Sequence, residues 1–266
     1  MKNLYWLSIA FGLVVAGFFL ADRRFTEVGL IGALICAGLT LGLGFWWFKP
    51  RPMWQGILWG ALAQPVVFSL NNQMVGISNK LGITHLDAAL YSPLPEETIK
   101  LLGVVIIVAA FKNVRHPYQA AAIGMAIGLG FDAMENVPFI LHAAIDNLDG
   151  DLWGVIITGI GRFFTGAFSH ALYTGVAAWG VGKLYAGARH GYWQVAGFWL
   201  AGIALHTLFN ASLIITGDWP VTFFLTALIT WTLIIWGLRF IRKQEKKYAA
   251  QKSETTLPTK DPEYSS

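Results

Sequence analysis

The sequence predicts an all-α protein, a polytopic bundle of about eight transmembrane helices. Hydrophobic residues make up 55% of the 266 positions and charged residues only 13%, whereas a soluble domain carries roughly 25% charged residues. The mean hydropathy is +0.54. Apolar runs of about 20 residues, the length that crosses a bilayer, recur along nearly the whole chain. A soluble protein is excluded on these grounds.

The apolar runs define the expected helices and domains. We predict helices at roughly 4–21, 27–48, 53–76, 93–111, 118–142, 152–183, 194–216 and 219–240. Residues 1–240 would form one membrane-embedded domain, and residues 241–266 a disordered, basic cytoplasmic tail near anionic lipid. Because most of the net charge of +4 lies in that tail, nucleic acid is not an expected partner. Residues 77–92 are too polar to span, and we expect a partly helical external loop there.

The distribution of basic residues predicts that both termini lie inside. Lys and Arg occur in the connections at 49–51, 112–115 and 183–189, whereas the connection at 146–151 holds only acidic charges. Cytoplasmic connections carry the excess of Lys and Arg in membrane proteins. Arg23 and Arg24 disagree with this orientation, because they fall in an outside connection.

Four predicted helices contain residues that are costly in lipid, where a charged side chain costs about 2.5–3.5 kcal/mol on insertion scales. The first pattern is Glu96 and Glu97 followed by Lys100, directly after two prolines at a helix start. Lys100 lies three and four residues after the carboxylates and can reach either of them. An ion pair at a helix start is the structural alternative, but two adjacent Glu point about 100° apart, so one Lys is not expected to neutralise both well.

The second and third patterns lie in the next two predicted helices. Glu135 and Asn136 follow Asp132 within an apolar run, and Asp132 and Glu135 share one helical face. Arg162 and His170 lie eight residues apart, near one face of the following helix. Arg162 is expected to be the counter-ion of a carboxylate, and an interhelical hydrogen bond is the structural alternative for His170.

The fourth pattern is His206 and Asn210, which are four residues apart and therefore stack on one helical face. A structural His–Asn bond would not explain why three other helices also bury polar groups. We therefore expect the four patterns to meet in one hydrated cavity within the bundle.

The residue types narrow the chemistry of such a cavity. The sequence has no His-Glu-x-x-His, as a site-2-type zinc protease needs, and no Tyr-Asp, as an aspartyl type needs; Ser169 lacks the glycine frame of a rhomboid nucleophile. Of the known strategies for hydrolysis within a membrane, only one that uses glutamate with histidine and asparagine fits these residues.

In order and spacing, the four patterns resemble the motifs of PrsW-type membrane proteases, relatives of the CAAX-prenyl-protease and bacteriocin-processing superfamily. The resemblance covers about residues 93–215 and includes Gly130-Phe131 before Glu135, and Ser169-His170 before Thr174. CAAX members place His where this chain has Glu135, so the PrsW branch fits better. The resemblance implies a multi-pass peptidase of the cell membrane that cleaves a membrane-anchored protein, such as an anti-sigma factor.

On this basis we assign roles to the polar residues. Glu97, together with Glu96, would be the general base that activates water. His206 and Asn210 would stabilise the oxyanion, and His170 and Glu135 would position water or protonate the leaving amine. The expected catalytic set is Glu96, Glu97, Glu135, His170, His206 and Asn210, supported by Lys100, Asn136 and Arg162.

Several alternatives stay open at this point. Zinc held by Glu97, Glu135, His170 and His206 is chemically feasible, but no ligand spacing demands it, and metal-independent glutamate chemistry is favoured. A CAAX-type or peptide-maturation protease is the nearest enzyme alternative. A proton-coupled transporter could use the same Glu and His residues as a proton relay, and a non-catalytic scaffold would need none of them.

Overall fold

A computed structural model describes residues 1–21, 25–48, 53–82, 91–111, 116–215 and 220–256. Within these ranges the chain is all-helical, as predicted, and contains no strand. The helices are α1 (Lys2–Ala21), α2 (Glu27–Phe48), α3 (Met53–Lys80), α5 (Pro93–Phe111), α6 (Pro117–Asp146), α7 (Asp151–Gly166), α8 (Ser169–Tyr185), α9 (Gly191–Ile215) and α10 (Pro220–Thr256).

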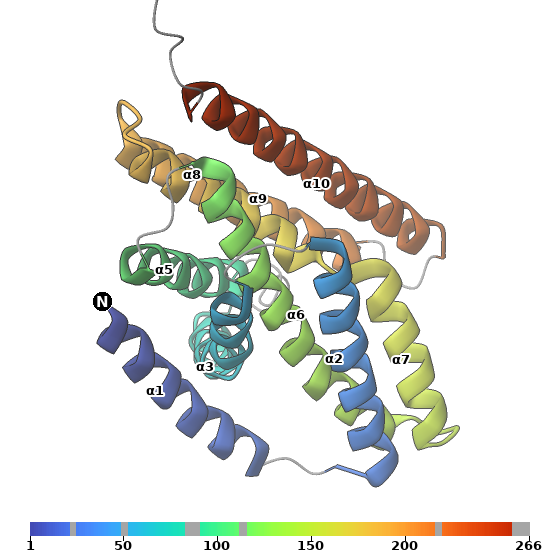
Figure 1. Ribbon diagram of the computed structural model, residues 1–266. Coiled ribbons are helices and arrows are strands. Elements are labelled where there is room, and N and C mark those ends of the chain that lie inside the picture. Colours follow the sequence, from blue (N-terminus) through green and yellow to red (C-terminus); the bar gives the residue numbers. More distant parts are fainter. Residues whose placement is uncertain (22–24, 49–52, 83–90, 112–115, 216–219, 257–266) are drawn as a thin grey trace, which may run out of the picture.

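Helix α6 is the central element of the bundle. It packs against α2, α3, α5, α7 and α8, and α8 in turn packs against α9 (Figure 1). Helix α10 lies along the outer side of α8 and α9, and α1 covers α3 and α5. A helix surrounded in this way must be apolar on every side, which explains why the run from Ala120 to Ala133 is buried throughout.

The sequence explains where α6 begins. Pro117 takes the first helical position, where a missing N–H is harmless. Before it, the His116 Nδ1 atom accepts a hydrogen bond from the Tyr118 amide, and the Gln119 side chain accepts one from the His116 amide. These reciprocal contacts form a capping box, with His116 in the place more often held by Ser or Thr.

Glycines let the neighbours of α6 approach its backbone closely. A Cβ atom on Gly128 would overlap the carbonyl oxygen of His170 in α8, and one on Gly130 would overlap that of Ile57 in α3. Small residues permit such contacts between membrane helices, where packing rather than the hydrophobic effect drives association. Gly128 therefore fixes how deeply the start of α8 sits against α6.

The predicted single helix at 152–183 is wrong, because the structure has two helices there. Helix α7 ends at Gly166, and α8 starts at Ser169 after Phe168, which adopts a left-handed backbone conformation with φ of 68°. This conformation costs about 1–3 kcal/mol for a residue other than glycine. Phe168 is 1% exposed, and its ring packs edge-on against Trp231, with centroids 5.8 Å apart. Burial of the ring offsets the strain.

Two further boundaries differ from the predictions. Helix α3 continues to Lys80, so the expected loop at 77–92 starts later, and residues 83–90 lie outside the described ranges. Helix α10 continues to Thr256. Residues 241–256 are thus helical rather than disordered, while residues 257–266 of the predicted tail lie outside the described ranges.

Apolar helices of membrane-spanning length are present, although the predicted number of spans is not confirmed. Among the described residues, three segments are long and apolar enough to cross a membrane: Glu27–Trp46, Asp151–Tyr185 and Gly191–Ser212. The basic connections at 22–24, 49–52 and 112–115 lie outside the described ranges. The eight-span count, the orientation of the termini and the division at residue 240 therefore stay predictions.

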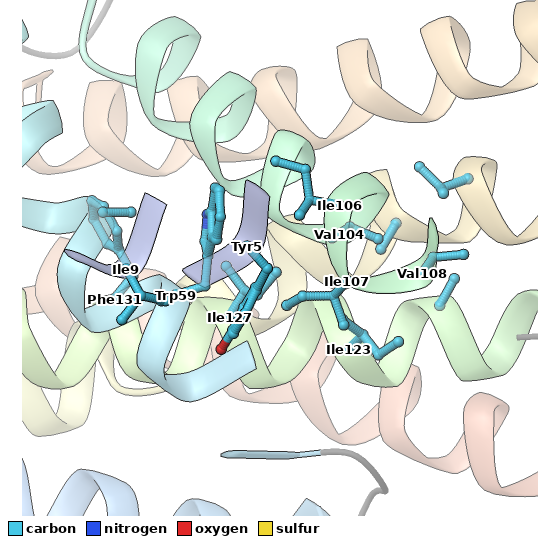
Figure 2. Close-up of a cluster of buried hydrophobic side chains, with 14 of the residues drawn as sticks. Tyr5, Ile9, Trp59, Val104, Ile106, Ile107, Val108, Ile123, Ile127 and Phe131 are labelled. Carbon is cyan, nitrogen blue, oxygen red and sulfur yellow. The ribbon is translucent and has the colours of Figure 1, made fainter. Parts of the chain in front are cut away.

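A hydrophobic core joins α1, α3, α5 and α6. Figure 2 shows Tyr5 and Ile9 of α1 beside Trp59 of α3, with Ile107 of α5 and Ile127 of α6 in the same cluster. The Trp59 indole N–H donates to the carbonyl oxygen of Ile99, 3.2 Å away. This bond ties α3 to α5 one turn below the paired glutamates.

Replacing Gly128 with alanine should loosen the contact between α6 and α8. We expect Gly128→Ala to lower the free energy of unfolding by about 1–3 kcal/mol, the usual cost of overpacking. Gly197→Ala is the matched control, since a Cβ on this helical glycine meets no atom within 4 Å. Thermal unfolding in detergent measures both. An equal melting temperature for the two variants would contradict the role given to Gly128.

Candidate active site

The first turn of α5 carries a buried charge cluster. Glu97 and Lys100 are both 0% exposed, and Glu96 is 4% exposed. The Lys100 Nζ atom lies 2.9 Å from Glu97 Oε1 and 3.3 Å from Glu96 Oε2. The expectation that Lys100 could not serve both carboxylates is therefore wrong, because its long side chain ends between them.

Lys100 also connects α5 with α6 and α8. Its Nζ atom lies 2.7 Å from His170 Nδ1 and 3.7 Å from the centroid of the Phe131 ring. An ammonium group can only donate hydrogen bonds, so His170 Nδ1 must accept. In a neutral ring the proton then sits on Nε2, which faces Glu135 Oε2 at 3.3 Å. His170 thus links the paired glutamates with the carboxylate of α6.

Glu135 is held on its other side by α7. Arg162 donates to Glu135 Oε2 and to Asn136 Oδ1, both at 2.5 Å, and its guanidinium covers the Phe139 ring at 3.9 Å from the centroid. The sequence predicted Arg162 as a counter-ion, and the structure places it in a salt bridge with Glu135. Asn136 also faces Thr40 of α2 at 3.5 Å.

Helix α9 brings His206 and Asn210 to the same region. His206 Nδ1 lies 3.2 Å from Glu97 Oε1, and Nε2 lies 3.9 Å from Glu96 Oε2. Asn210 is placed one turn further along, where its amide nitrogen donates to the Ser92 hydroxyl at 3.3 Å. The structure therefore brings His206 to the glutamates, while Asn210 borders the start of α5.

A cavity of about 470 Å³ collects these groups. Its wall is formed by α3, α5, α6, α7, α8 and α9, and includes Glu96, Glu135, His170, His206 and Asn210. Glu97 is absent from this wall, since its oxygens are enclosed by Lys100, His206 and Thr174. The expectation of one shared cavity agrees with this geometry, and the catalytic roles stay proposals.

Three residues of the site, Asp132, Tyr173 and Thr174, were given no role from the sequence. Thr174 donates its hydroxyl to Glu97 Oε2 at 3.0 Å. The Tyr173 ring stacks on His206, with centroids 5.0 Å apart. Both follow His170 by one helical turn, a spacing that could have indicated them. Asp132 is 3% exposed, and its Oδ2 atom has no hydrogen-bond partner; Oδ1 lies 3.9 Å from His170 Nε2.

Helix α3 also reaches the site, although residues before 93 carried no motif. Asn71 donates its amide to Glu96 Oε1 at 3.3 Å, and Gln64 lines the same cavity. The two amides are seven residues apart in an apolar run. This spacing places both amides on one helical face, and it could have indicated from the sequence that α3 contributes to the site.

The described residues offer two groups of donors that could hold a metal ion. Glu96, Glu97, His170 and His206 place one donor atom each within 4.8 Å of one another, and so do Asp132, Glu135 and His170. The ligand set expected from sequence differs from the first group in one member, since Glu135 falls in the second group and Glu96 is in the first; the ligand set stays a prediction. Two carboxylates and two imidazoles are ligands that zinc accepts. Lys100 contacts three of these four donors, so a metal and the ammonium group would compete for them.

Comparison with known proteins gave one match. The family model described as PrsW family intramembrane metalloprotease matches residues 49–237, well over half of the chain. No curated protein and no solved structure matches. The matched range starts before the motifs recognised in the sequence and includes α3, which supplies Asn71 and Gln64 to the cavity.

Removing the Thr174 hydroxyl should disturb Glu97. We expect Thr174→Val to lower the free energy of unfolding by about 1–3 kcal/mol, because a buried carboxylate oxygen loses its donor. Thr174→Ser should restore the stability. Thr232→Val is the control, since this exposed hydroxyl donates to the Leu228 carbonyl oxygen of its own helix. Thermal unfolding measures all three variants. A wild-type melting temperature for Thr174→Val would refute the role of the Thr174 hydroxyl as a partner of Glu97.

Proposed function

Because the chain belongs to the PrsW family of intramembrane metalloproteases, we propose that this peptidase cleaves a membrane-anchored protein in the cavity bounded by α3, α5, α6, α7, α8 and α9. The observation that carries the proposal is the convergence of Glu96, Glu135, His170 and His206 on one cavity among apolar helices. An anti-sigma factor cut on its outer side is the substrate class that the family resemblance implies. A multi-pass location in the cell membrane is proposed with it.

The geometry favours Glu96 over Glu97 as the group that activates water. Both glutamates use their two carboxylate oxygens in contacts, but Glu96 lines the cavity, whereas Glu97 is fully buried and is not part of the cavity wall. Glu97 then acts as a fixed acceptor that orients Lys100 and His206. The sequence had instead indicated Glu97, together with Glu96, as the general base.

The hydrolysis proceeds in two steps. Glu96 takes a proton from water while the water oxygen attacks the carbonyl carbon of the substrate. His206, in its imidazolium form, donates from Nε2 to the developing oxyanion, and the amide of Asn210 lies one turn away on the same helix. When the C–N bond breaks, the proton that Glu96 took from water passes to the leaving amine by way of His170, which Glu135 orients from 3.3 Å.

A metal would be held by Glu96, Glu97, His170 and His206, and in that form His206 would be a neutral ligand rather than the imidazolium donor. The family description names a metalloprotease, which speaks against the metal-independent chemistry favoured from sequence. When bound, such an ion would supply Lewis acidity to the carbonyl oxygen. Zinc is the proposed ion because the donors are imidazole nitrogens and carboxylate oxygens.

Loss of the reacting groups, or of the carboxylate that orients them, should abolish cleavage. We expect Glu96→Gln and His206→Ala to lower the cleavage rate by about 100-fold or more, the usual contribution of acid–base and oxyanion-stabilising groups. Glu97→Gln should have a similar effect, because Lys100 and His206 lose their common carboxylate partner. The measurement is mass spectrometry of new N-termini after the purified chain is reconstituted with membrane proteins from cells that lack it. Glu27→Gln, an exposed carboxylate at the start of α2, is the control. Wild-type rates for all three site variants would refute the assignment, and no new N-termini with the wild-type chain would refute the function.

Zinc should stabilise the folded chain through the proposed ligands. A ligand that binds only the folded state raises the melting temperature, and the rise grows with the logarithm of the ratio of ligand concentration to Kd. After chelation, we expect zinc to raise the melting temperature of the wild type and of His190→Asn, whose histidine lies outside both donor groups. The shift should vanish in His206→Ala and in Glu97→Gln. Equal shifts in all four proteins would exclude this ligand set.

A further inference from the structure

A substrate peptide in this cavity brings unpaired backbone groups into a poorly hydrated space. A peptide bond becomes accessible to hydrolysis only when the surrounding segment is extended rather than helical. In lipid each unsatisfied backbone N–H or C=O costs several kcal/mol. A protease that works within the bundle therefore needs partners for the N–H groups of its substrate.

Helix α3 presents two acceptors without partners at the cavity. Gln64 is 3% exposed, and its buried Oε1 atom has no hydrogen-bond partner among the residues that the structure describes. The same holds for the buried Oδ1 atom of Asn71. Both residues line the cavity that contains Glu96 and His170. Buried polar atoms are nearly always paired, so two such oxygens on one wall point to a ligand that donates hydrogen bonds.

The contact of Asn71 with Glu96 defines which atom faces a ligand. Its amide nitrogen donates to Glu96 Oε1 at 3.3 Å, because a carboxylate can only accept. The side-chain oxygen is thereby left as the free acceptor. Since Glu96 is the proposed base, this acceptor lies next to the reacting bond.

The spacing of the two residues suits an extended chain. Seven residues correspond to about two helical turns, so Gln64 and Asn71 share one face and are separated by roughly 10 Å along the helix. An extended peptide covers this length in about three residues. Helix α3 is anchored to α5 by the bond from Trp59 to the Ile99 carbonyl oxygen, so the two acceptors are held in place before a ligand arrives.

We infer that Gln64 and Asn71, here called the amide face of α3, form a binding subsite for the extended backbone of the substrate. Their side-chain carbonyl oxygens accept hydrogen bonds from substrate N–H groups beside the scissile bond. The inference rests on the proposed function and adds to it a mode of recognition that is independent of substrate side chains. Selectivity for segments that unwind easily follows from it.

The chain supplies a matched control for Gln64. Gln55 lies on the same helix, is 6% exposed, and also has a buried Oε1 atom without a partner, but it does not line the cavity. Methionine resembles glutamine in shape and removes the acceptor. Because neither oxygen has a protein partner, neither Gln64→Met nor Gln55→Met should lower the melting temperature. A purely structural role would therefore affect the two variants alike.

The test measures peptide binding without cleavage. The probe is the hexapeptide acetyl-Leu-Ala-Leu-Ala-Leu-Ala-amide, together with six forms that each carry one N-methylated peptide nitrogen. It is titrated against the full chain carrying Glu97→Gln, an enclosed residue that does not line the cavity. Affinities are obtained from the ligand-induced rise of the melting temperature.

We expect Gln64→Met to weaken binding of the unmodified hexapeptide by roughly tenfold, the equivalent of one hydrogen bond, and Gln55→Met to leave it unchanged. N-methylation at one position should weaken binding by a similar factor when Gln64 is present. That effect should disappear in Gln64→Met, because the two changes remove the same bond.

Three results would overturn the subsite: no binding of the hexapeptide, equal binding by Gln64→Met and its parent, or a methylation effect that persists in Gln64→Met. Failure of the proposed function gives a different pattern. In that case the wild-type chain cuts no membrane protein, while the hexapeptide still binds with the expected dependence on Gln64. If the wild type cleaves a membrane protein but hexapeptide binding does not depend on Gln64, only the proposed subsite is refuted.

Discussion

The buried ammonium group of Lys100 is the centre of the polar interior. It lies within 3.3 Å of Glu96, Glu97 and His170, and it covers the face of the Phe131 ring. Removing one partner from a buried ion pair leaves an uncompensated charge and is strongly destabilising. The first turn of α5, the middle of α6 and the start of α8 must therefore keep their relative positions for the chain to remain folded.

The backbone is adapted to this requirement. Gly128 and Gly130 allow α8 and α3 to approach α6 so closely that no Cβ would fit. The turn at Phe168 ends α7 and starts α8 directly before His170. A continuous helix would place Arg162 and His170 on one rigid rod, whereas the turn allows both to contact Glu135 from different helices. The strain at Phe168 and the charge network therefore depend on each other.

The periodicity of polar residues predicted much of this arrangement. Glutamates, histidines and arginine recurring in four apolar helices indicated a shared cavity, because burying each separately would be too costly. The turn at Phe168 could not be predicted, since a phenylalanine with positive φ has no sequence signature and depends on the distant Trp231 for its burial. Gln64 and Asn71 were overlooked for another reason. Uncharged amides cost less in a membrane helix than charged side chains, so no partners were sought for Gln64 and Asn71 from the sequence alone.

The charges of the cavity imply how it responds to ligands. Glu96, Glu97, Asp132 and Glu135 contribute four carboxylates, against the two cations of Lys100 and Arg162. With all four ionised and both histidines neutral, the cluster carries two negative charges in excess. Such an excess is expensive in an apolar bundle, and either a divalent cation or two protons shared among His170, His206 and Asp132 would remove it. A bound metal and a protonated His206 are therefore alternative ways of neutralising the same site. Metal binding requires Lys100 to give up part of its contacts with Glu96, Glu97 and His170, which makes this lysine the residue that sets the balance between the two forms.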